Sequence, residues 1–142
     1  MTRQYKFRAF FKEDDGDLGM YYNVSPHGEY LAVTFNNDGK YDICDIDDFH
    51  VMEYTGLNDV EGKEIYEWDV VEMKPNVYAD PQHYMVYRHY GGEYRLETPA
   101  HGCPLWLRRD KVKVVGNVFE NPELMDKHFV AIRIKDVERW YE

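Results

Sequence analysis

Short runs in which apolar and polar residues alternate, separated by glycine, proline and asparagine, constrain this 142-residue chain more than any other feature. Successive side chains of a strand point to opposite faces, so alternation of period two predicts a half-buried strand. Gly91-Gly92 separates two tyrosine-rich runs, 83–90 and 93–97, in the clearest hairpin. We expect further strands at residues 5–11, 20–24, 30–35, 40–44, 50–54, 65–73, 111–119 and 130–134.

The connections between these runs predict turns and a single helical region. Residues 36–39 form a hairpin loop that brings 40–44 back onto 30–35, because Asn and Gly tolerate the positive φ of such turns. Residues 25–28, 55–64 and 98–104 are expected to lie outside regular structure. Asn121 as N-cap, followed by Pro122 and Glu123, predicts a short helix that ends near residue 128. A terminal helical turn follows at 136–141, so the fold class is mainly β with one short C-terminal helix.

Charge is distributed unevenly along the chain. The whole sequence carries 17 Lys and Arg against 27 Asp and Glu, a net charge of −10. Phosphates are bound by Lys and Arg, so this balance disfavours a general binder of nucleic acid or of anionic membranes. Residues 1–80 hold 18 acids and 7 bases, whereas residues 81–142 hold 9 acids and 10 bases. We therefore expect a protein with one acidic side and one mildly basic side.

The sequence also indicates a compartment. The basic start is not followed by the apolar run of roughly 7 to 15 residues that a secretory signal needs. No stretch approaches the roughly 18 apolar residues of a membrane span. We expect a cytoplasmic protein without membrane contact, in which Cys44 and Cys103 are partly buried thiols.

Metal ligands and catalytic groups are weakly indicated. A zinc site from three histidines and one cysteine is conceivable, but the spacing matches no tight ligand pair. Histidines in tyrosine-rich strands more often lie at the surface without binding a metal. The acids at 42, 45, 47 and 48 would suit a metal-dependent nuclease, yet runs of acids are usually solvated faces. We expect no catalytic residue, metal or cofactor. The sequence leaves open whether the four zinc candidates meet in space. These candidates are His83, His89, His101 and Cys103.

Basic and aromatic residues are interleaved in the second half of the chain. On a small β-barrel, such residues would form a stacking platform for single-stranded nucleic acid, or a surface for a protein partner. The alternative is an ordinary β surface with aromatic pairs. The candidate surface comprises Tyr87, Arg88, Tyr94, Arg95, Trp106, Arg108 and Arg109.

Four segments carry a resemblance to a known family. Residues 54–71, the signature segment, read Tyr-Thr-Gly-Leu-Asn-Asp-Val-Glu-Gly-Lys-Glu-Ile-Tyr-Glu-Trp-Asp-Val-Val. Residues 6–10, 51–53 and 115–124 agree in order and spacing. Together they resemble the YopX-like family of phage and prophage proteins, in which glycine usually stands at the place of Trp68. The resemblance implies a phage or prophage origin and an SH3-like small barrel over 55–120. An N-terminal β-rich segment (1–54) precedes this barrel, and a C-terminal helix and tail (121–142) follow it. We expect the three parts to pack as one compact unit. The resemblance implies no activity.

The family-motif residues also have a direct physical interpretation. Glycines permit turns that other residues resist, Asp can cap its own backbone, and the apolar residues supply core. We interpret the motif residues as structural and expect a non-enzymatic accessory protein that binds a protein partner or itself. The alternatives are a nucleic-acid-binding barrel and, less favoured, a metal-dependent enzyme; no small-molecule substrate is inferred. The motif residues are Gly56, Leu57, Asp59, Gly62, Ile65, Tyr66, Asp69, Gly116 and Asn117.

Overall fold

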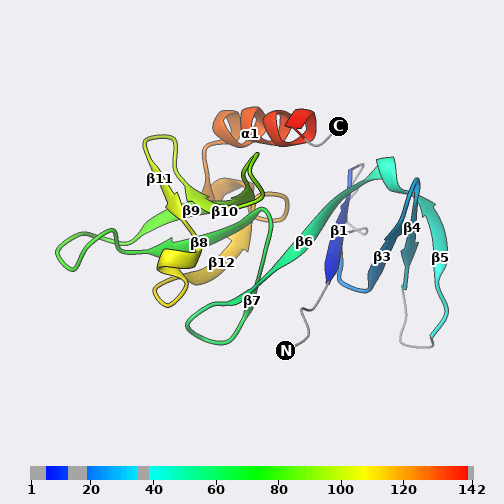
Figure 1. Cartoon of the computed structure of the whole chain (residues 1–142), viewed down its shortest axis with the longest axis horizontal. Coiled ribbons are helices and arrows are strands. Elements are labelled where there is room, and N and C mark those ends of the chain that lie inside the picture. Colours follow the sequence, from blue (N-terminus) through cyan, green and yellow to red (C-terminus); the bar gives the residue numbers. More distant parts are fainter. Residues whose placement is uncertain (1–5, 13–18, 35–38, 141–142) are drawn as a thin grey trace. The chain divides into compact units, whose positions relative to one another are not determined.

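The structure, a computed structural model, describes residues 6–12, 19–34 and 39–140. The chain forms two compact units, Met1–Gly56 and Leu57–Glu142 (Figure 1). The expectations at residue 5, for the loop 36–38 and at residue 141 lie outside the described residues. The three-part division at residues 54 and 120 stays a prediction.

The first unit contains two antiparallel groups of strands around a small core. One group has the order β2-β1-β6, with Ala9 opposite Val51; the other has the order β3-β4-β5, with Leu31 opposite Cys44. The strands are β1 (Phe7–Phe11), β2 (Met20–Tyr21), β3 (Val24–His27), β4 (Tyr30–Val33), β5 (Asp42–Asp45) and β6 (Phe49–Asn58), with the short helix η1 (Ile46–Asp48) before β6. The buried core residues are Ala9, Leu31, Val33 and Phe49.

Several strand boundaries in this unit differ from those predicted. The expected strand 20–24 ends at Tyr21, and the expected turn at Ser25 and Pro26 is strand β3. Proline is tolerated there because β3 lies at the edge of its sheet, where an N–H donor is dispensable. Strand β6 continues to Asn58 through residues that we expected to form a connection. Pairing of β5 with β4 is confirmed.

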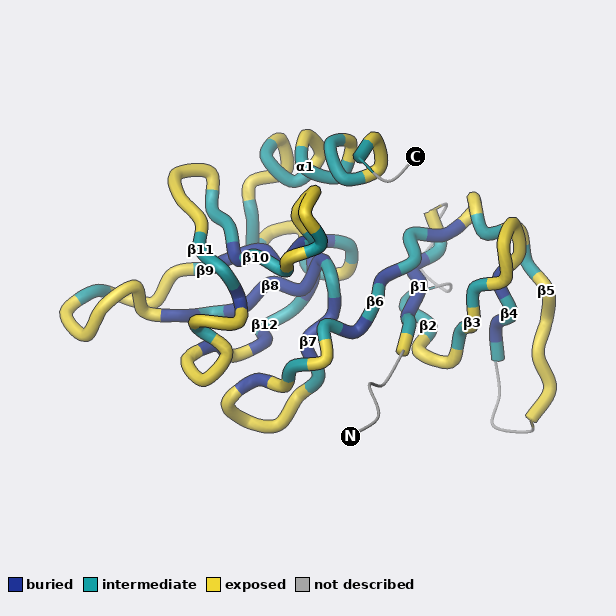
Figure 2. The backbone as a smooth tube through the Cα atoms, viewed as in Figure 1, coloured by how far each residue is buried: buried dark blue, intermediate teal, exposed yellow. Residues whose placement is uncertain are grey.

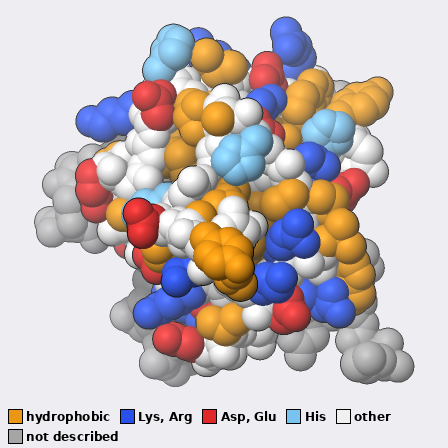
Figure 3. All heavy atoms as spheres, turned by 90° about the vertical axis from the view of Figure 1, so that its left-hand side faces the viewer, with side chains coloured by type: hydrophobic (Ala, Val, Ile, Leu, Met, Phe, Trp, Pro, Cys, Tyr) orange, Lys and Arg blue, Asp and Glu red, His pale blue; other side chains and the backbone are white. Residues whose placement is uncertain are grey.

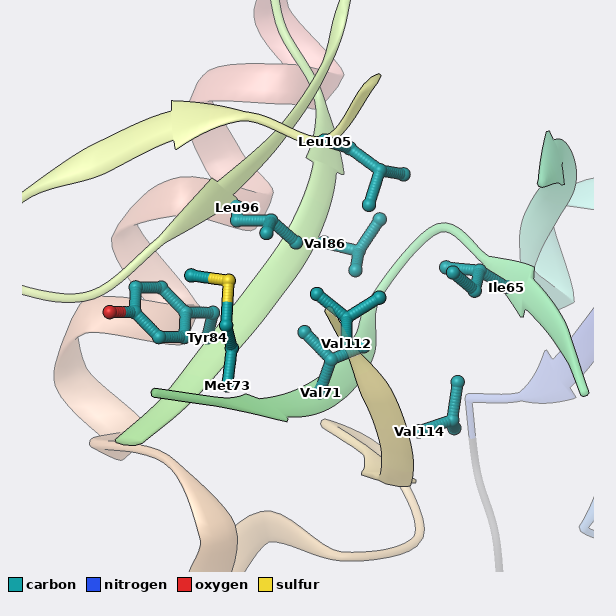
Figure 4. Packing of buried hydrophobic residues seen from close by; sticks show 9 residues of the cluster. All are labelled: Ile65, Val71, Met73, Tyr84, Val86, Leu96, Leu105, Val112 and Val114. Carbon is teal, nitrogen blue, oxygen red and sulfur yellow. The ribbon is translucent and has the colours of Figure 1, made fainter. Parts of the chain in front are cut away.

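The second unit is built on a five-stranded antiparallel sheet of order β11-β10-β9-β8-β12, which curls into a half-barrel. Its strands are β8 (Asp69–Met73), β9 (Gln82–Arg88), β10 (Tyr94–Glu97), β11 (Gly102–Pro104) and β12 (Lys113–Asn117). The end of β6 and β7 (Glu64–Tyr66) form a further hairpin. The core, drawn in Figure 4, comprises Ile65, Val71, Met73, Tyr84, Val86, Leu96, Leu105, Val112 and Val114. A mainly β fold is confirmed; the SH3-like assignment stays a prediction.

Two predictions for this sheet are wrong in detail. The expected strand 65–73 is interrupted by a turn at Glu67 and Trp68, where Trp68 has a φ of 66°. The segment 98–104 contains β11, whose Cys103 lies opposite Leu96 of β10. A strand this short is specified by its partner strand rather than by its own sequence.

The C-terminal helix is longer than predicted and begins later. Residues 122–124 form only a short 3-10 turn, η3 (Pro122–Leu124), and α1 spans Lys127–Trp140. The expected strand at 130–134 is therefore wrong. The cap is Asp126, whose Oδ1 accepts the N–H of Phe129 at 2.8 Å. Val130, Ile134 and Val137 are half-buried at helical spacing, whereas Ile132 is exposed. No described helix is long and apolar enough to cross a bilayer.

Candidate binding surface

The carboxylate of Asp59 joins three parts of the second unit. Its Oδ1 accepts the N–H groups of Glu61 (2.8 Å) and Lys63 (2.9 Å), and its Oδ2 accepts the N–H of Val114 (2.8 Å). Gly62, between the first two donors, has a φ of 84° that a side chain would strain. Because the side chain is buried and its oxygens are engaged by backbone groups, Asp59 organises the β6–β7 hairpin on β12.

A second carboxylate supports the tight turn that follows β7. Asp69 Oδ2 accepts the N–H of Tyr66 at 2.8 Å, so that the turn between them is closed by a side chain. The backbone N–H of Trp68 donates to the carbonyl of Val86 (2.7 Å), and the carbonyl of Trp68 accepts the N–H of Val118 (3.0 Å). The turn is thus retained with tryptophan at the position where the resemblance implies glycine.

The closing part of the motif also binds its own backbone. Asn117 Oδ1 accepts the N–H groups of Phe119 (3.0 Å) and Glu120 (2.8 Å), and the N–H of Asn117 donates to Asn121 Oδ1 (3.2 Å). Gly116 adjoins a bulge in the pairing of β12 with β8. A Cβ at Gly116 would lie 2.4 Å from Asn121 Oδ1. These side chains are engaged in positioning backbone rather than in facing a ligand.

We expect Gly116→Ala to lower the free energy of unfolding by about 1–3 kcal/mol, because the added methyl group overpacks the site and displaces the Asn121 side chain. Urea denaturation followed by circular dichroism measures the change. Gly91→Ala is the matched control, since its Cβ would meet nothing within 4 Å. Equal stabilities of the two variants would contradict the steric argument.

The structure separates the residues of the predicted nucleic-acid or partner surface. Tyr87 is buried, and its ring lies between Trp68 (centroids 6.4 Å apart) and the guanidinium of Arg133 on α1 (5.2 Å). Arg133 also forms an ion pair with Glu97. Burial, with the hydrogen bond to Glu97 and its negative charge, raises the pKa of Tyr87 to about 12. Tyr87 is therefore unavailable for stacking on a ligand.

The neighbouring candidates on β9 and β10 do not form an open platform either. Tyr94 packs against the core of the second unit and lies directly opposite Arg88. Arg95 lies opposite Tyr87 and pairs with Glu93, with 3.4 Å between Arg95 Nη1 and Glu93 Oε1. These residues belong to the sheet rather than to a binding surface.

The remaining candidates lie on the short helix η2 (Trp106–Arg108) and at Arg109, the residue that caps its end. The Trp106 side chain is 59% exposed and Leu107 is 60% exposed. The guanidinium of Arg109 lies 3.9 Å from the centre of the Trp106 ring, and Nη1 of Arg109 donates to the Trp106 carbonyl at 2.6 Å. Arg109 therefore holds Trp106 in place while both remain accessible to a partner.

A groove next to η2 adds residues that the sequence did not single out as a set. It has a volume of about 360 Å³ and lies between the β8–β9 loop and the turn after η2. In that loop Val77 is 81% and Tyr78 is 96% exposed. Figure 3 shows this end of the second unit, with Lys and Arg side chains beside hydrophobic ones, and Figure 2 shows the exposed loop. We call this surface the basic–aromatic end: Lys74, Val77, Tyr78, Trp106, Leu107, Arg108, Arg109 and Lys111.

Two of the zinc candidates are occupied by other contacts. The ring of His83 donates from Nδ1 to the carbonyl of Leu124 (3.2 Å), and its Nε2 lies 3.7 Å from a carboxylate oxygen of Glu72. His89 packs against the indole of Trp140, with ring centres 5.6 Å apart. Both residues therefore contribute to the packing of the segment that follows β12 on the sheet.

The other two zinc candidates lie in and around β11. His101 Nε2 lies 3.3 Å from the hydroxyl of Tyr84, and its Nδ1 lies 3.2 Å from the hydroxyl of Thr98. Cys103 is a free thiol packed against the core. Among the residues that the structure describes, no three His, Cys, Asp or Glu side chains form a group that could hold a metal ion.

Comparison with known proteins gives one family and several similar structures, two of which are described below. The family model described as YopX protein matches residues 6–126. The crystal structure of protein EF1440 from Enterococcus faecalis is similar with a TM-score of 0.62 at 26% identity, over 88% of this chain and all of that one. The crystal structure of protein yopX from Bacillus subtilis is similar with a TM-score of 0.57 at 16% identity, over 85% of this chain and 98% of that one. Among curated proteins, none matches this chain.

Proposed function

The chain belongs to the YopX family, and on this premise we propose that it is a non-enzymatic binding module that contacts another protein through the basic–aromatic end. The family description names no reaction. The proposal includes an accessory role in a phage or prophage and a location in the cytoplasm of the bacterial host. Self-association through the same surface is the second form that such a module can take.

The observation that carries the proposal is the exposure of Trp106 and Leu107 on one short helix, beside Arg108 and the capping residue Arg109. Tryptophan, tyrosine and arginine are enriched at the energetic centres of protein interfaces. A turn that presents an indole already fixed by a guanidinium loses little side-chain entropy when it binds a partner. Val77 adds an exposed apolar side chain to the groove, and the neighbouring Tyr78 is exposed as well.

Affinity capture from host lysate, compared between the native protein and Trp106→Ala, tests the proposal. We expect the native protein to retain a defined partner that Trp106→Ala loses, because the indole supplies the largest apolar contact of this surface. Tyr41→Ala is the matched control, since Tyr41 is an exposed aromatic residue of the first unit. A partner retained equally by both variants would refute the assignment to this surface. Light scattering of the purified protein separates self-association from binding of another protein.

Single-stranded nucleic acid is the second candidate ligand, and the cations of the groove are what favour it. Lys74, Arg108 and Lys111 line one groove next to an exposed indole, the combination on which single strands bind. Titration with a labelled oligonucleotide at ~50 mM salt tests it where electrostatic affinity is greatest. Absence of binding there would exclude this alternative.

A further inference from the structure

We propose that the groove between Lys74, Arg108 and Lys111 receives a carboxylate of the partner, so that the docking segment of the partner is an acidic stretch flanked by apolar side chains. This inference rests on the proposed function and names the chemistry of its partner. The groove walls comprise Lys74, Pro75, Asn76, Val77, Arg108 and Lys111. Three of these six residues are cations and none is acidic.

The cations of the groove are not engaged in ion pairs within the part of the chain that is described. None of Lys74, Arg108 and Lys111 forms an ion pair with a described residue, whereas Lys113 nearby pairs with Glu61 at 3.5 Å. Three cations around one groove repel one another, and an anion between them removes that repulsion. The groove therefore favours a ligand with negative charge.

Both walls are backbone turns, so the stems of the cationic side chains are anchored around the groove before a ligand arrives. On one side the N–H of Lys111 donates to the carbonyl of Arg108 (2.9 Å). On the other side Asn76 Oδ1 accepts the N–H of Tyr78 (2.9 Å), which fixes the loop after Lys74. A guanidinium can bind a carboxylate with two parallel hydrogen bonds, and the ammonium groups add point charges.

The apolar residues of the walls favour a peptide over nucleic acid. Pro75 and the exposed Val77 offer aliphatic contacts, which suit Leu or Phe side chains better than sugars and phosphates. Arg109 covers one face of the Trp106 ring and reduces the area on which a base could stack. A long polyanion would also run beyond this patch onto the rest of the second unit, where Asp and Glu outnumber Lys and Arg, whereas a short acidic peptide meets only the local cations.

Fluorescence anisotropy with the full-length protein and three labelled probes tests the inference. The probes are a short peptide that alternates Glu with Leu and Phe, the same peptide with Gln for every Glu, and an oligothymidylate of similar length. We expect the acidic peptide to bind about tenfold more tightly than its Gln counterpart, and less tightly as salt rises. The double variant Arg108→Gln and Lys111→Gln should remove that difference, whereas Lys113→Gln should keep it.

Each other result overturns the inference in a recognisable way. Equal binding of the acidic and Gln peptides would refute the carboxylate and leave protein binding through this surface standing. Binding of the oligonucleotide in place of both peptides would refute the inference and the proposed function together, in favour of nucleic acid. Binding of no probe would refute the acidic segment, while the capture experiment with Trp106→Ala still decides the proposed function. A dimer that depends on Arg108 would assign the groove to a second copy of this chain.

Discussion

Replacement of Asp59 by alanine is expected to lower the free energy of unfolding by about 4 kcal/mol, the largest effect that we expect from a single polar residue. The variant leaves three backbone N–H groups, those of Glu61, Lys63 and Val114, without the carboxylate that accepts them. Hydrogen bonds to a charged group contribute more than neutral ones, and a buried donor without an acceptor is costly. Chemical denaturation monitored by circular dichroism measures the loss.

The matched control for Asp59 is Asp110→Ala, since Asp110 is exposed and accepts no hydrogen bond from the described backbone. We expect that control to stay within about 0.5 kcal/mol of the native protein. A loss at Asp59 no larger than the loss at Asp110 would show that the carboxylate does not hold the hairpin on β12.

The contribution of Asp59 should also depend on pH. Burial raises the pKa of Asp59, but the N–H donors of Val114, Lys63 and Glu61 and the charge of Lys63 outweigh it and lower the pKa below its usual 3.8. A folded-state pKa below the unfolded value gives stability that is fully present above the unfolded pKa and is lost as pH falls through the folded pKa. We expect the difference between native protein and Asp59→Ala to shrink in acid, as measured by denaturation at neutral and acidic pH.

Substitution of Trp68 by glycine is expected to destabilise the protein, although the resemblance implies glycine at this place. Loss of a buried tryptophan side chain costs about 3–5 kcal/mol, and the Trp68 ring is buried against Tyr87. Glycine relieves the strain of the positive φ, which is worth about 1 kcal/mol. Packing outweighs backbone strain, so the net loss should be about 2–4 kcal/mol.

Trp68→Ala separates the two contributions at this turn. Alanine removes the same ring but keeps the side-chain penalty at φ 66°, so its stability should lie about 1 kcal/mol below that of Trp68→Gly. Thermal and urea denaturation of the two variants and the native protein give the order. A glycine variant more stable than the native protein would show that strain, not packing, decides this position.

Local patterns predicted the hairpins correctly because period-two runs and turn residues lie side by side in the sequence. The β9–β10 hairpin and the return of β5 onto β4 are of this kind. The error at α1 arose because Val130, Ile132 and Ile134 alternate as in a strand, whereas the set that the helix half-buries, Val130, Ile134 and Val137, recurs at helical spacing. The cap at Asp126 was the available signal for the helix.

The candidate surface was predicted in part, since Trp106, Arg108 and Arg109 are close in sequence and lie on η2 and its C-cap. The prediction that Tyr87 belongs to this surface is wrong because Arg133 of α1 packs over the Tyr87 ring. No sequence pattern around β9 indicates that contact. The residues on the other wall of the groove, 74–77, are equally remote in sequence from Arg108. The sequence feature that indicates this wall of the groove is the loop between Pro75 and Pro81, which carries Val77 and Tyr78.

Two acidic residues of the first unit lie on the edge strand of its β3-β4-β5 sheet. Strand β5 ends the order β3-β4-β5, and Ile43 on it is exposed, as is Tyr41 just before it. An exposed apolar edge is a template for strands of other molecules and thus for aggregation. Asp42 and Asp45 lie at the two ends of this edge. Repulsion between such acids when two edges approach protects the chain from uncontrolled strand addition at high concentration.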